Sequence, residues 1–442
     1  MKEMILFNSP IYPTRMDVNE RYIPPLGLGY IATQIKNAGI DVEIVDCVNE
    51  KMGISDVLRM IKSYKPKFIG LNIFTQNFDI VKEIVENCPV ETHILIGGQA
   101  VKPLYEEILN WHTVNNLTIV VGEAELIIPE IMKGTCLEQP RYSKGKKQVF
   151  FVGCKSPYFP ADLNAIQIDR TLLGESIGLN RHGEKESSII TSRGCVYDCA
   201  FCAAAYSTSH DFTVRYRTVL NIEEEIIQIM KLCPDLASIR VLDDLYLKSE
   251  RDIFNAIKLF EKFESLSWRC MAHVISLRNS LKCLPKMKES GCKELFIGIE
   301  SGSDRIRRKI KKHGTCEDVL KVVTRVLEQG IDVKGYFMLG IPSETDEDAK
   351  MTYQLASQLK VASKELAGNF RPSVFQFRPY HGTQLYNEII KEQGVVGKVK
   401  ANTALNINEE RSQFNFHSGN YSDIQDELLN EYILKIQKMV RD

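Results

Sequence analysis

Three closely spaced cysteines are the residues of this chain whose types and spacing point most directly to chemistry. Cys195, Cys199 and Cys202 follow the pattern Cys-x3-Cys-x2-Cys. Three thiolates on one loop can bind an iron–sulfur cluster and leave one iron open to another ligand, whereas electron-transfer clusters normally use four cysteines. A structural zinc site needs a fourth ligand, and the nearest suitable residue, His210, stands at no zinc-finger spacing. The spacing favours an iron–sulfur site with one open iron, and zinc is the alternative.

The other nine of the twelve cysteines stand singly along the chain, mostly in apolar surroundings. Isolated cysteines of this kind usually behave as small buried apolar residues. A disulfide framework is typical of small secreted domains, so we do not expect one in this long chain.

Polar residues stand where several expected strands of the second half end. These strands span 188–192, 238–242, 268–274, 294–299, 333–339 and 373–378, with helices such as 222–232, 252–263, 319–328 and 346–359 between them. Six such units fit an incomplete TIM-like barrel, in which ligand-binding and catalytic residues lie at the carboxyl ends of the strands. The candidates there are Asp243, Asp244, Gly298, Glu300, Ser301, Arg378, Tyr380 and His381.

The chemistry of these side chains suggests their roles. Glu300 can accept hydrogen bonds from the amine or ribose of a cofactor, and the neighbouring glycine permits a close approach of the backbone. Arg378 is a candidate for substrate binding. The candidates for proton transfer are Asp243, Asp244, Tyr380 and His381. Helix capping is the structural alternative for the two aspartates.

The first 133 residues alternate shorter apolar runs with helical patterns. Strands are expected at 4–7, 42–45, 68–71, 93–96 and 117–120, and helices at 28–36, 54–61, 78–85, 104–109 and 124–132. This pattern predicts a doubly wound, Rossmann-like domain, whose ligands bind at the carboxyl ends of the strands. The candidate ligand-binding residues at those ends are Asn72, Thr75, Gly97, Gly98, Gly122 and Glu123. The GxGxxG fingerprint of dinucleotide binding is absent from the glycines around residue 27.

The cysteine loop and the strand ends resemble the radical S-adenosylmethionine (SAM) superfamily, whose signature is this loop after the first strand of a partial (βα)6 barrel. The resemblance implies that Cys195, Cys199 and Cys202 hold a 4Fe-4S cluster whose fourth iron is chelated by SAM. It also places Phe201 and the segment 298–303 at the cofactor. It further implies reductive cleavage of SAM to a 5'-deoxyadenosyl radical, with an electron from a flavodoxin- or ferredoxin-type donor.

Four segments of the first domain resemble the cobalamin-binding domain that precedes many radical SAM enzymes. They are residues 24–30, 70–78, 97–100 and 121–125. The motif Asp-x-His-x-x-Gly, which supplies a histidine to cobalt in classical cobalamin mutases, is missing, because Asp46-Cys47-Val48 contains no histidine. We therefore expect cobalamin bound without a protein histidine ligand. A scaffold domain that holds no cofactor is the alternative.

Composition narrows the classes of partner. The 56 Lys and Arg residues nearly balance the 57 Asp and Glu residues, so no overall field favours nucleic acid or an anionic membrane. No apolar run approaches the ~20 residues of a membrane span, and the N-terminus lacks the apolar region of a secretory signal. These features predict a cytoplasmic protein that acts on a small molecule.

We therefore expect four regions: a cobalamin-type domain (1–133), a linker (134–186), a radical SAM barrel (187–394) and a C-terminal helical extension (395–442), the last a lid or packing element. The leading hypothesis is cobalamin-dependent C-methylation of a small polar substrate. The alternative is a cobalamin-independent dehydratase or epimerase acting on sugar- or aminoglycoside-type substrates in natural-product biosynthesis. A non-catalytic cobalamin or iron–sulfur sensor is a third hypothesis.

Overall fold

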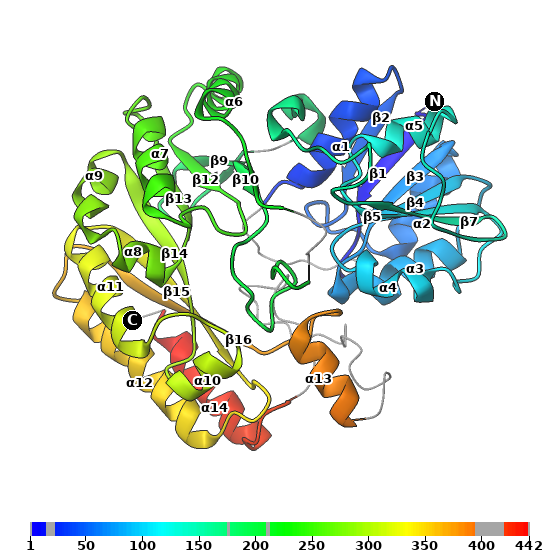
Figure 1. Cartoon of the computed structure of the whole chain (residues 1–442). Coiled ribbons are helices and arrows are strands. Elements are labelled where there is room, and N and C mark those ends of the chain that lie inside the picture. The colour runs from blue at the N-terminus through cyan, green and yellow to red at the C-terminus, as the bar shows by residue number, and fades with distance from the viewer. Residues whose placement is uncertain (1, 15–22, 175–176, 209–212, 394–419, 441–442) are drawn as a thin grey trace.

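In a computed structural model, the protein folds into two α/β domains that lie side by side (Figure 1). The structure describes residues 2–14, 23–174, 177–208, 213–393 and 420–440. Within these residues each domain is built on one seven-stranded sheet. The expected fold class, a doubly wound domain followed by a partial barrel, is confirmed.

The first sheet has the strand order β2-β1-β3-β4-β5-β7-β6. Its parallel strands are β1 (Met4–Asn8), β2 (Val42–Asp46), β3 (Phe68–Asn72), β4 (His93–Gly97), β5 (Asn116–Gly122) and β7 (Lys147–Val152). Helices cover both faces, which is why the strands read as continuous apolar runs. One face is covered by α1 (Leu26–Asn37) and α5 (Ile127–Lys133), and the other by α2 (Ile54–Tyr64), α3 (Phe78–Glu86) and α4 (Val101–Ile108).

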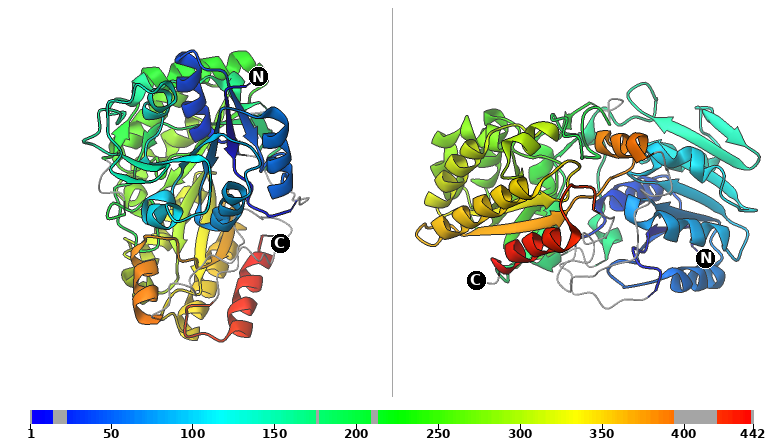
Figure 2. Two further views of the ribbon diagram at one scale, coloured as in Figure 1. Left: turned by 90° about the vertical axis from the view of Figure 1, so that its right-hand side faces the viewer. Right: turned by 90° about the horizontal axis from the view of Figure 1, so that it is seen from below.

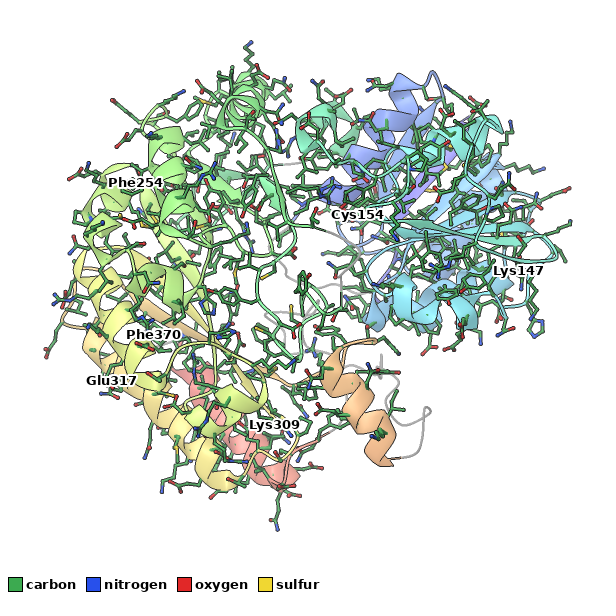
Figure 3. The ribbon with its side chains drawn as sticks, viewed as in Figure 1. Lys147, Cys154, Phe254, Lys309, Glu317 and Phe370 are labelled. Carbon is green, nitrogen blue, oxygen red and sulfur yellow. The ribbon has the colours of Figure 1, made fainter. Side chains whose placement is uncertain are left out.

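A hairpin extends this sheet beyond the five strands that we expected. We expected a linker to begin at residue 134. Instead β7 pairs in parallel with β5, and β6 (Tyr142–Lys144) pairs antiparallel with β7. Val149 is fully buried, so this strand completes the core of the first sheet. Lys147 begins β7 at the outer edge of the domain (Figure 3).

The chain between the domains packs back onto α1. Its two short helices are η2 (Leu163–Ala165) and η3 (Arg170–Leu173). Gly29 on α1 makes this packing possible, because a Cβ there would lie 2.8 Å from Ile168 and 2.9 Å from Leu173. The part of the expected linker from Leu163 to Leu173 therefore packs on the first domain.

The second sheet is a half-barrel with the order β16-β15-β14-β13-β12-β9-β8. Its six parallel strands are β9 (Lys185–Ile189), β12 (Ser238–Val241), β13 (Ser267–Ala272), β14 (Cys292–Glu300), β15 (Asp332–Leu339) and β16 (Phe370–Gln376), and β8 (Ile177–Leu179) is antiparallel. The helices on its outer face are α6 (Val219–Leu232), α7 (Glu250–Phe260), α8 (Val274–Arg278), α9 (Leu284–Glu289), α10 (Asp304–Lys309), α11 (Cys316–Glu328) and α12 (Asp346–Ser363). Phe370 at the start of β16 is fully buried and meets Phe337 edge to face.

Two helices follow the last strand. The first, α13 (Gln384–Gln393), contacts the cysteine loop, because the N–H of Leu385 donates to the carbonyl oxygen of Ala200 (3.0 Å). The second, α14 (Asp426–Lys438), is the amphipathic helix that we expected at the C-terminus, and it packs on α12 and β16 (Figure 2). Residues 394–419, most of the polar part of the expected extension, lie outside the described residues. Among the described residues, no helix is both long and apolar enough to cross a bilayer.

Candidate active site

The three cysteines lie on the loop that follows the two-residue strand β10 (Ser192–Arg193). Gly194 begins the loop with φ of 90°, a conformation that suits glycine. The N–H of Cys202 donates to the carbonyl oxygen of Cys199 (3.1 Å), which folds the loop back on itself. All three thiols are half-buried and outside any disulfide, and burial raises the pKa of Cys202 to about 12.

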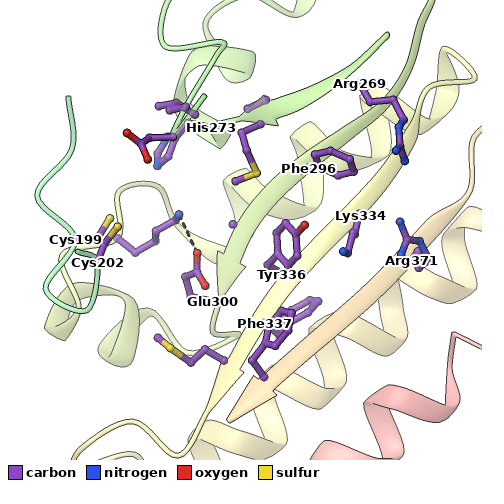
Figure 4. A pocket seen from close by; sticks show the side chains of 18 of the residues that line it. Cys199, Cys202, Arg269, His273, Phe296, Glu300, Lys334, Tyr336, Phe337 and Arg371 are labelled. Atoms are coloured by element: carbon purple, nitrogen blue, oxygen red, sulfur yellow. Dashed lines mark hydrogen bonds and ion pairs between the residues drawn. The ribbon is translucent and has the colours of Figure 1, made fainter. Parts of the chain in front are cut away.

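A cavity of about 1230 Å³ joins this loop to the interior of the half-barrel. Cys199 and Cys202 line one end of it (Figure 4), and Cys195 also belongs to its lining. The rings of Phe296 and Tyr336 lie in its middle, and Arg269, Lys334 and Arg371 line the opposite end. Phe201, which we expected near the cofactor, also lines the cysteine end.

Glu300 faces the cysteines from the end of β14, and three features of the backbone aim it there. It has φ of 68°, which is unusual for a residue with a side chain, and the register with β15 shifts between Gly298 and Glu300. A Cβ at Gly298 would collide with the Glu300 carboxylate and lie 2.6 Å from Lys312 Nζ. Glu300 binds Lys312 through an ion pair of 3.1 Å (Figure 4). Such local strain is often kept where a side chain has a function.

His273 is a second polar group in the cavity, directly after β13. Its Nδ1 accepts the N–H of Ile275 (3.1 Å), so the neutral ring carries its proton on Nε2. That Nε2 is buried without a hydrogen-bond partner among the described residues. Burial, together with Lys312 and other nearby cations, lowers the pKa of His273 to about 2, which keeps the ring neutral. The ring stacks on Tyr197 with centroids 4.0 Å apart, so it offers one N–H donor beside the cysteine loop.

The two aspartates after β12 have different positions, although we expected both at the active face. Asp244 lines the cavity, and burial, with the neighbouring Asp243, raises its pKa. Asp243 is buried outside the cavity lining, where it accepts hydrogen bonds from the N–H and hydroxyl of Thr191 (both 2.7 Å) and from Ser192. In this structure Asp243 holds the chain leading to the cysteines, and its expected part in proton transfer stays a prediction.

Ser301 is likewise placed away from the cavity. It is fully buried, and its hydroxyl lies 3.2 Å from that of Thr352 and accepts the N–H of Ser303 (3.1 Å). It supports the turn after Glu300 rather than facing a cofactor. Arg378 and Tyr380, in contrast, line the cavity and are hydrogen-bonded to each other.

His381 faces the first domain instead of the cavity. Its Nδ1 lies 3.2 Å from the hydroxyl of Thr75, which we expected to contact a cofactor in the first domain. The ring packs against Tyr386 (4.7 Å between centroids) and Phe78 (6.3 Å), and burial lowers its pKa to about 4. The barrel thus brings a histidine, His381, to the edge of the first domain.

Glycines line the carboxyl edge of the first sheet, where we expect ligands to bind. Gly98 and Gly122 are exposed there with φ of 112° and 115°, and a Cβ at Gly98 would strike the backbone of Ile73. At Gly97 a Cβ would come within 4 Å of a single atom, so the space in front of it is open. The side chain of Asn72 is already engaged, because it accepts the N–H of Ser9 (2.7 Å) and donates to Asn8 (3.0 Å). Because these glycines have no side chains, a flat ligand can approach the backbone closely at this edge.

Glu123 connects this edge to the cysteine loop. Its carboxylate forms ion pairs with Arg193 (2.5 Å) and with Arg215, and Arg193 also binds Glu125 (2.7 Å). The Lys102 ammonium donates to the carbonyl oxygen of Thr208 (3.0 Å) nearby. These contacts turn the carboxyl ends of the two sheets toward each other. Glu123, expected to bind a cofactor, is therefore engaged between the domains.

The donor set suits an iron–sulfur cluster. Three free thiols share one cavity wall, and thiolates are the usual ligands of such clusters. Among the described residues, no three His, Cys, Asp or Glu side chains are grouped as they would be around a single metal ion.

Several lining residues were missed from the sequence. His273 follows a strand directly, so the rule that selected Asp244 could also have selected it. Lys334 and Tyr336 alternate with the buried Val333 and Phe337, a period of two that marks one face of a strand. Lys312 gave no such signal, because it lies on a loop after α10 and reaches Glu300 only through the fold.

Two family models match separate parts of the chain. Residues 189–356 match the model of the radical SAM superfamily. Residues 15–132 match the model of the B12 binding domain. The two matched regions contain the cysteine loop and the glycine-lined crevice, respectively.

Two curated proteins resemble the chain over most of its length. An uncharacterized methyltransferase of Pyrococcus horikoshii is 28% identical over 385 residues, which covers 83% of this chain and 78% of that protein. The cytidylyl-2-hydroxyethylphosphonate methyltransferase of Streptomyces wedmorensis is 23% identical, covering 88% and 82%.

A solved structure shares the fold. It is the radical SAM methyltransferase TsrM of Kitasatospora setae with its tryptophan substrate and a SAM analogue bound, with a TM-score of 0.64 and 14% identity. The match covers 89% of this chain and 77% of that one. At this level of identity the likeness shows a common fold, in which a crevice-bearing domain precedes a half-barrel.

Proposed function

The chain belongs to the radical SAM superfamily and carries a B12-binding domain, and we propose that it methylates a carbon atom of a small polar substrate in the half-barrel cavity. It is a radical SAM enzyme whose cofactors are a 4Fe-4S cluster, SAM and cobalamin. The observation that carries the proposal is that the Glu123–Arg193 ion pair joins the glycine-lined edge of the first sheet to the cysteine loop.

The residues at the cysteine end are assigned to the first cofactors. Cys195, Cys199 and Cys202 hold the cluster, and Glu300 accepts hydrogen bonds from the amine or ribose of SAM. Phe201 lies against the apolar cluster that includes Met338, which gives the adenine an apolar wall. When bound, the cluster supplies the electron that cleaves SAM reductively, and cobalamin carries the methyl group.

The residues of the crevice are assigned to cobalamin. Gly97, Gly98 and Gly122 present backbone to the flat ring, and Thr75 borders it beside His381. Asn72 contributes through the network that fixes the end of β3 rather than through a free side chain.

Each cleavage of SAM consumes one electron, so the enzyme needs an external one-electron donor. We propose a flavodoxin- or ferredoxin-type protein in this role. Tyr380, Arg378 and Asp244 line the cavity and are the polar groups assigned to substrate contacts.

The experiment uses anaerobically reconstituted protein, methyl-labelled SAM, a chemical reductant and fractionated small-molecule extracts. We expect one product to gain a single labelled methyl group, with one 5'-deoxyadenosine and one S-adenosylhomocysteine formed per product. The Cys199→Ala variant should form none of the three, whereas Cys154→Ala, at an exposed cysteine outside the loop, should behave as wild type. Turnover without bound cobalamin, giving a dehydrated or epimerised product, would contradict the proposal.

A further inference from the structure

The end of the cavity opposite the cysteines is lined by basic side chains (Figure 4). They come from inward-facing positions on four strands: Arg240 on β12, Arg269 on β13, Lys334 on β15 and Arg371 on β16. Three of these cations lie close to the ring of Phe296. The distances to its centroid are 5.1 Å for Arg240, 5.4 Å for Arg269 and 5.9 Å for Lys334. An aromatic face attracts a cation, but three cations around one ring repel one another.

Carboxylates neutralise only part of this charge. Arg269 binds Glu186 and Glu294, and Glu294 also binds Arg371 (2.8 Å). Arg240 forms no ion pair within the described part of the chain, and its Nε is buried without a hydrogen-bond partner, as is the Nε of Arg371. Burial and the nearby Arg269 lower the pKa of Arg240, as expected for an uncompensated cation.

Cationic side chains also outnumber carboxylates over the cavity as a whole. Seven lysine or arginine residues line it in the described chain, against Asp244, Glu300 and Asp332. Glu186 and Glu294 behind the lining raise the number of carboxylates to five. An excess of positive charge around a cavity, with guanidinium N–H groups left without partners, is an arrangement that binds an oxyanion.

We propose that the substrate carries an oxyanion group, such as a phosphate, phosphonate or carboxylate, which binds between Arg240, Lys334 and Arg371. This inference rests on the proposed function, because it assigns the substrate class to the same cavity. Lys334 and Met338 lie on the same face of β15, four residues apart. At ~3.3 Å per residue they are separated by roughly 13 Å. An anion held at Lys334 thus leaves the rest of a metabolite-sized molecule to reach the cysteine end, where Met338 and Glu300 lie.

The test measures anion binding by calorimetry on anaerobically reconstituted full-length protein at constant ionic strength. The probes are methylphosphonate and acetate, with dimethyl sulfone as an uncharged comparison. We expect at least one anion to bind and dimethyl sulfone not to bind. The Kd for the anion should rise about tenfold or more in Arg240→Gln and in Lys334→Gln. Arg251→Gln, at an exposed position on α7, should leave the Kd unchanged. The better anion identifies phosphonate-like or carboxylate chemistry.

Two further measurements separate this site from a merely structural cluster. Without anion, the thermal midpoint of Arg240→Gln should not fall, because the variant removes a cation that faces Arg269 and Lys334. Substrate-free cleavage of SAM to 5'-deoxyadenosine should persist in both variants. A lowered midpoint with an unchanged Kd, or no anion binding to wild type, would overturn the anion site. If the wild-type protein does not cleave SAM, that result would instead contradict the proposed function.

Discussion

Glu123 and Arg193 form an ion pair of 2.5 Å that joins the two domains beside the cysteine loop. Arg193 stands two residues before Cys195, and Glu123 follows β5 at the crevice of the first domain. The guanidinium of Arg193 also lies over the ring of Tyr30, 5.3 Å from its centroid. Two residues of the first domain, Glu123 and Tyr30, therefore contact this guanidinium. Arg193 thereby ties the chain just before the cysteines to the first domain.

The first prediction concerns this contact. Glu123→Gln should lower the free energy of unfolding by roughly 1–3 kcal/mol, because the half-buried Arg193 and the buried Arg215 lose a charged partner. Iron content and SAM affinity should stay unchanged, while the yield of methylated product per 5'-deoxyadenosine falls. Chromatography of both products, with Glu91→Gln at an exposed position as control, checks this. An unchanged yield would show that the ion pair does not position the domains.

The second prediction concerns the cluster ligands. Replacing Cys195, Cys199 and Cys202 together by alanine should abolish the iron–sulfur absorbance and all SAM cleavage, because three thiolates provide the protein ligands. Wild type should bind about four irons. Iron analysis and visible spectra provide the measurement.

Cysteines elsewhere supply the control for that experiment. Single alanine variants of the buried Cys233, Cys283 and Cys292, and of the half-buried Cys88, should keep the full iron content. These variants should instead lower the thermal midpoint of unfolding, since each removes a packed side chain. Iron loss in a folded variant of this set would mean that the ligands were assigned wrongly.

The third prediction concerns Glu300. Glu300→Ala should weaken SAM binding on the order of tenfold or more without loss of the cluster, because a charge-assisted hydrogen bond is removed. Glu317→Ala, on the outer layer of helices (Figure 3), is the matched control and should leave the Kd unchanged. Equilibrium binding of SAM to reconstituted protein measures the effect, and equal affinities in the two variants would return Glu300 to a structural role.

The sequence predicted the elements of the fold better than the contacts between domains. Strand periodicity and the cysteine spacing are local signals, and they located β14, Glu300 and the loop. Thr75 and His381, which meet in the structure, are 306 residues apart, and no local pattern encodes such a contact. The partners of Asp243 gave no local signal for a related reason, because its hydrogen bonds go to Thr191 at a different strand end.

The fourth prediction concerns cobalt. The electron paramagnetic resonance spectrum of the cobalt(II) form bound to the protein should lack splitting from an axial nitrogen. The first domain supplies no histidine at the crevice, and His381 is held by Thr75, Phe78 and Tyr386. His381→Ala should therefore leave the spectrum unchanged. Nitrogen splitting in wild type that disappears in this variant would make His381 a cobalt ligand and contradict the expectation.

The fifth prediction concerns Glu344, a fully buried carboxyl in the turn after β15. Its Oε2 accepts the N–H groups of Gly340 (2.6 Å) and Ile341 (3.2 Å), and its Oε1 has no partner in the described chain. Burial raises the pKa of Glu344 to about 8, against the hydrogen bonds from the turn that lower it. The folded protein therefore holds a proton here that the unfolded chain releases near pH 4.5.

Because the folded state binds the extra proton, stability should fall as pH rises from about 4.5 to about 8, by at most about 1.4 kcal/mol per pH unit from this group. Glu344→Gln keeps an oxygen acceptor for the turn and removes the titration, so its unfolding free energy should depend less steeply on pH in that window. Glu347→Gln, an exposed carboxyl at the start of α12, should retain the wild-type slope. Denaturant unfolding at several pH values gives the slopes. Parallel curves for wild type and Glu344→Gln would show that Glu344 is ionised in the folded protein.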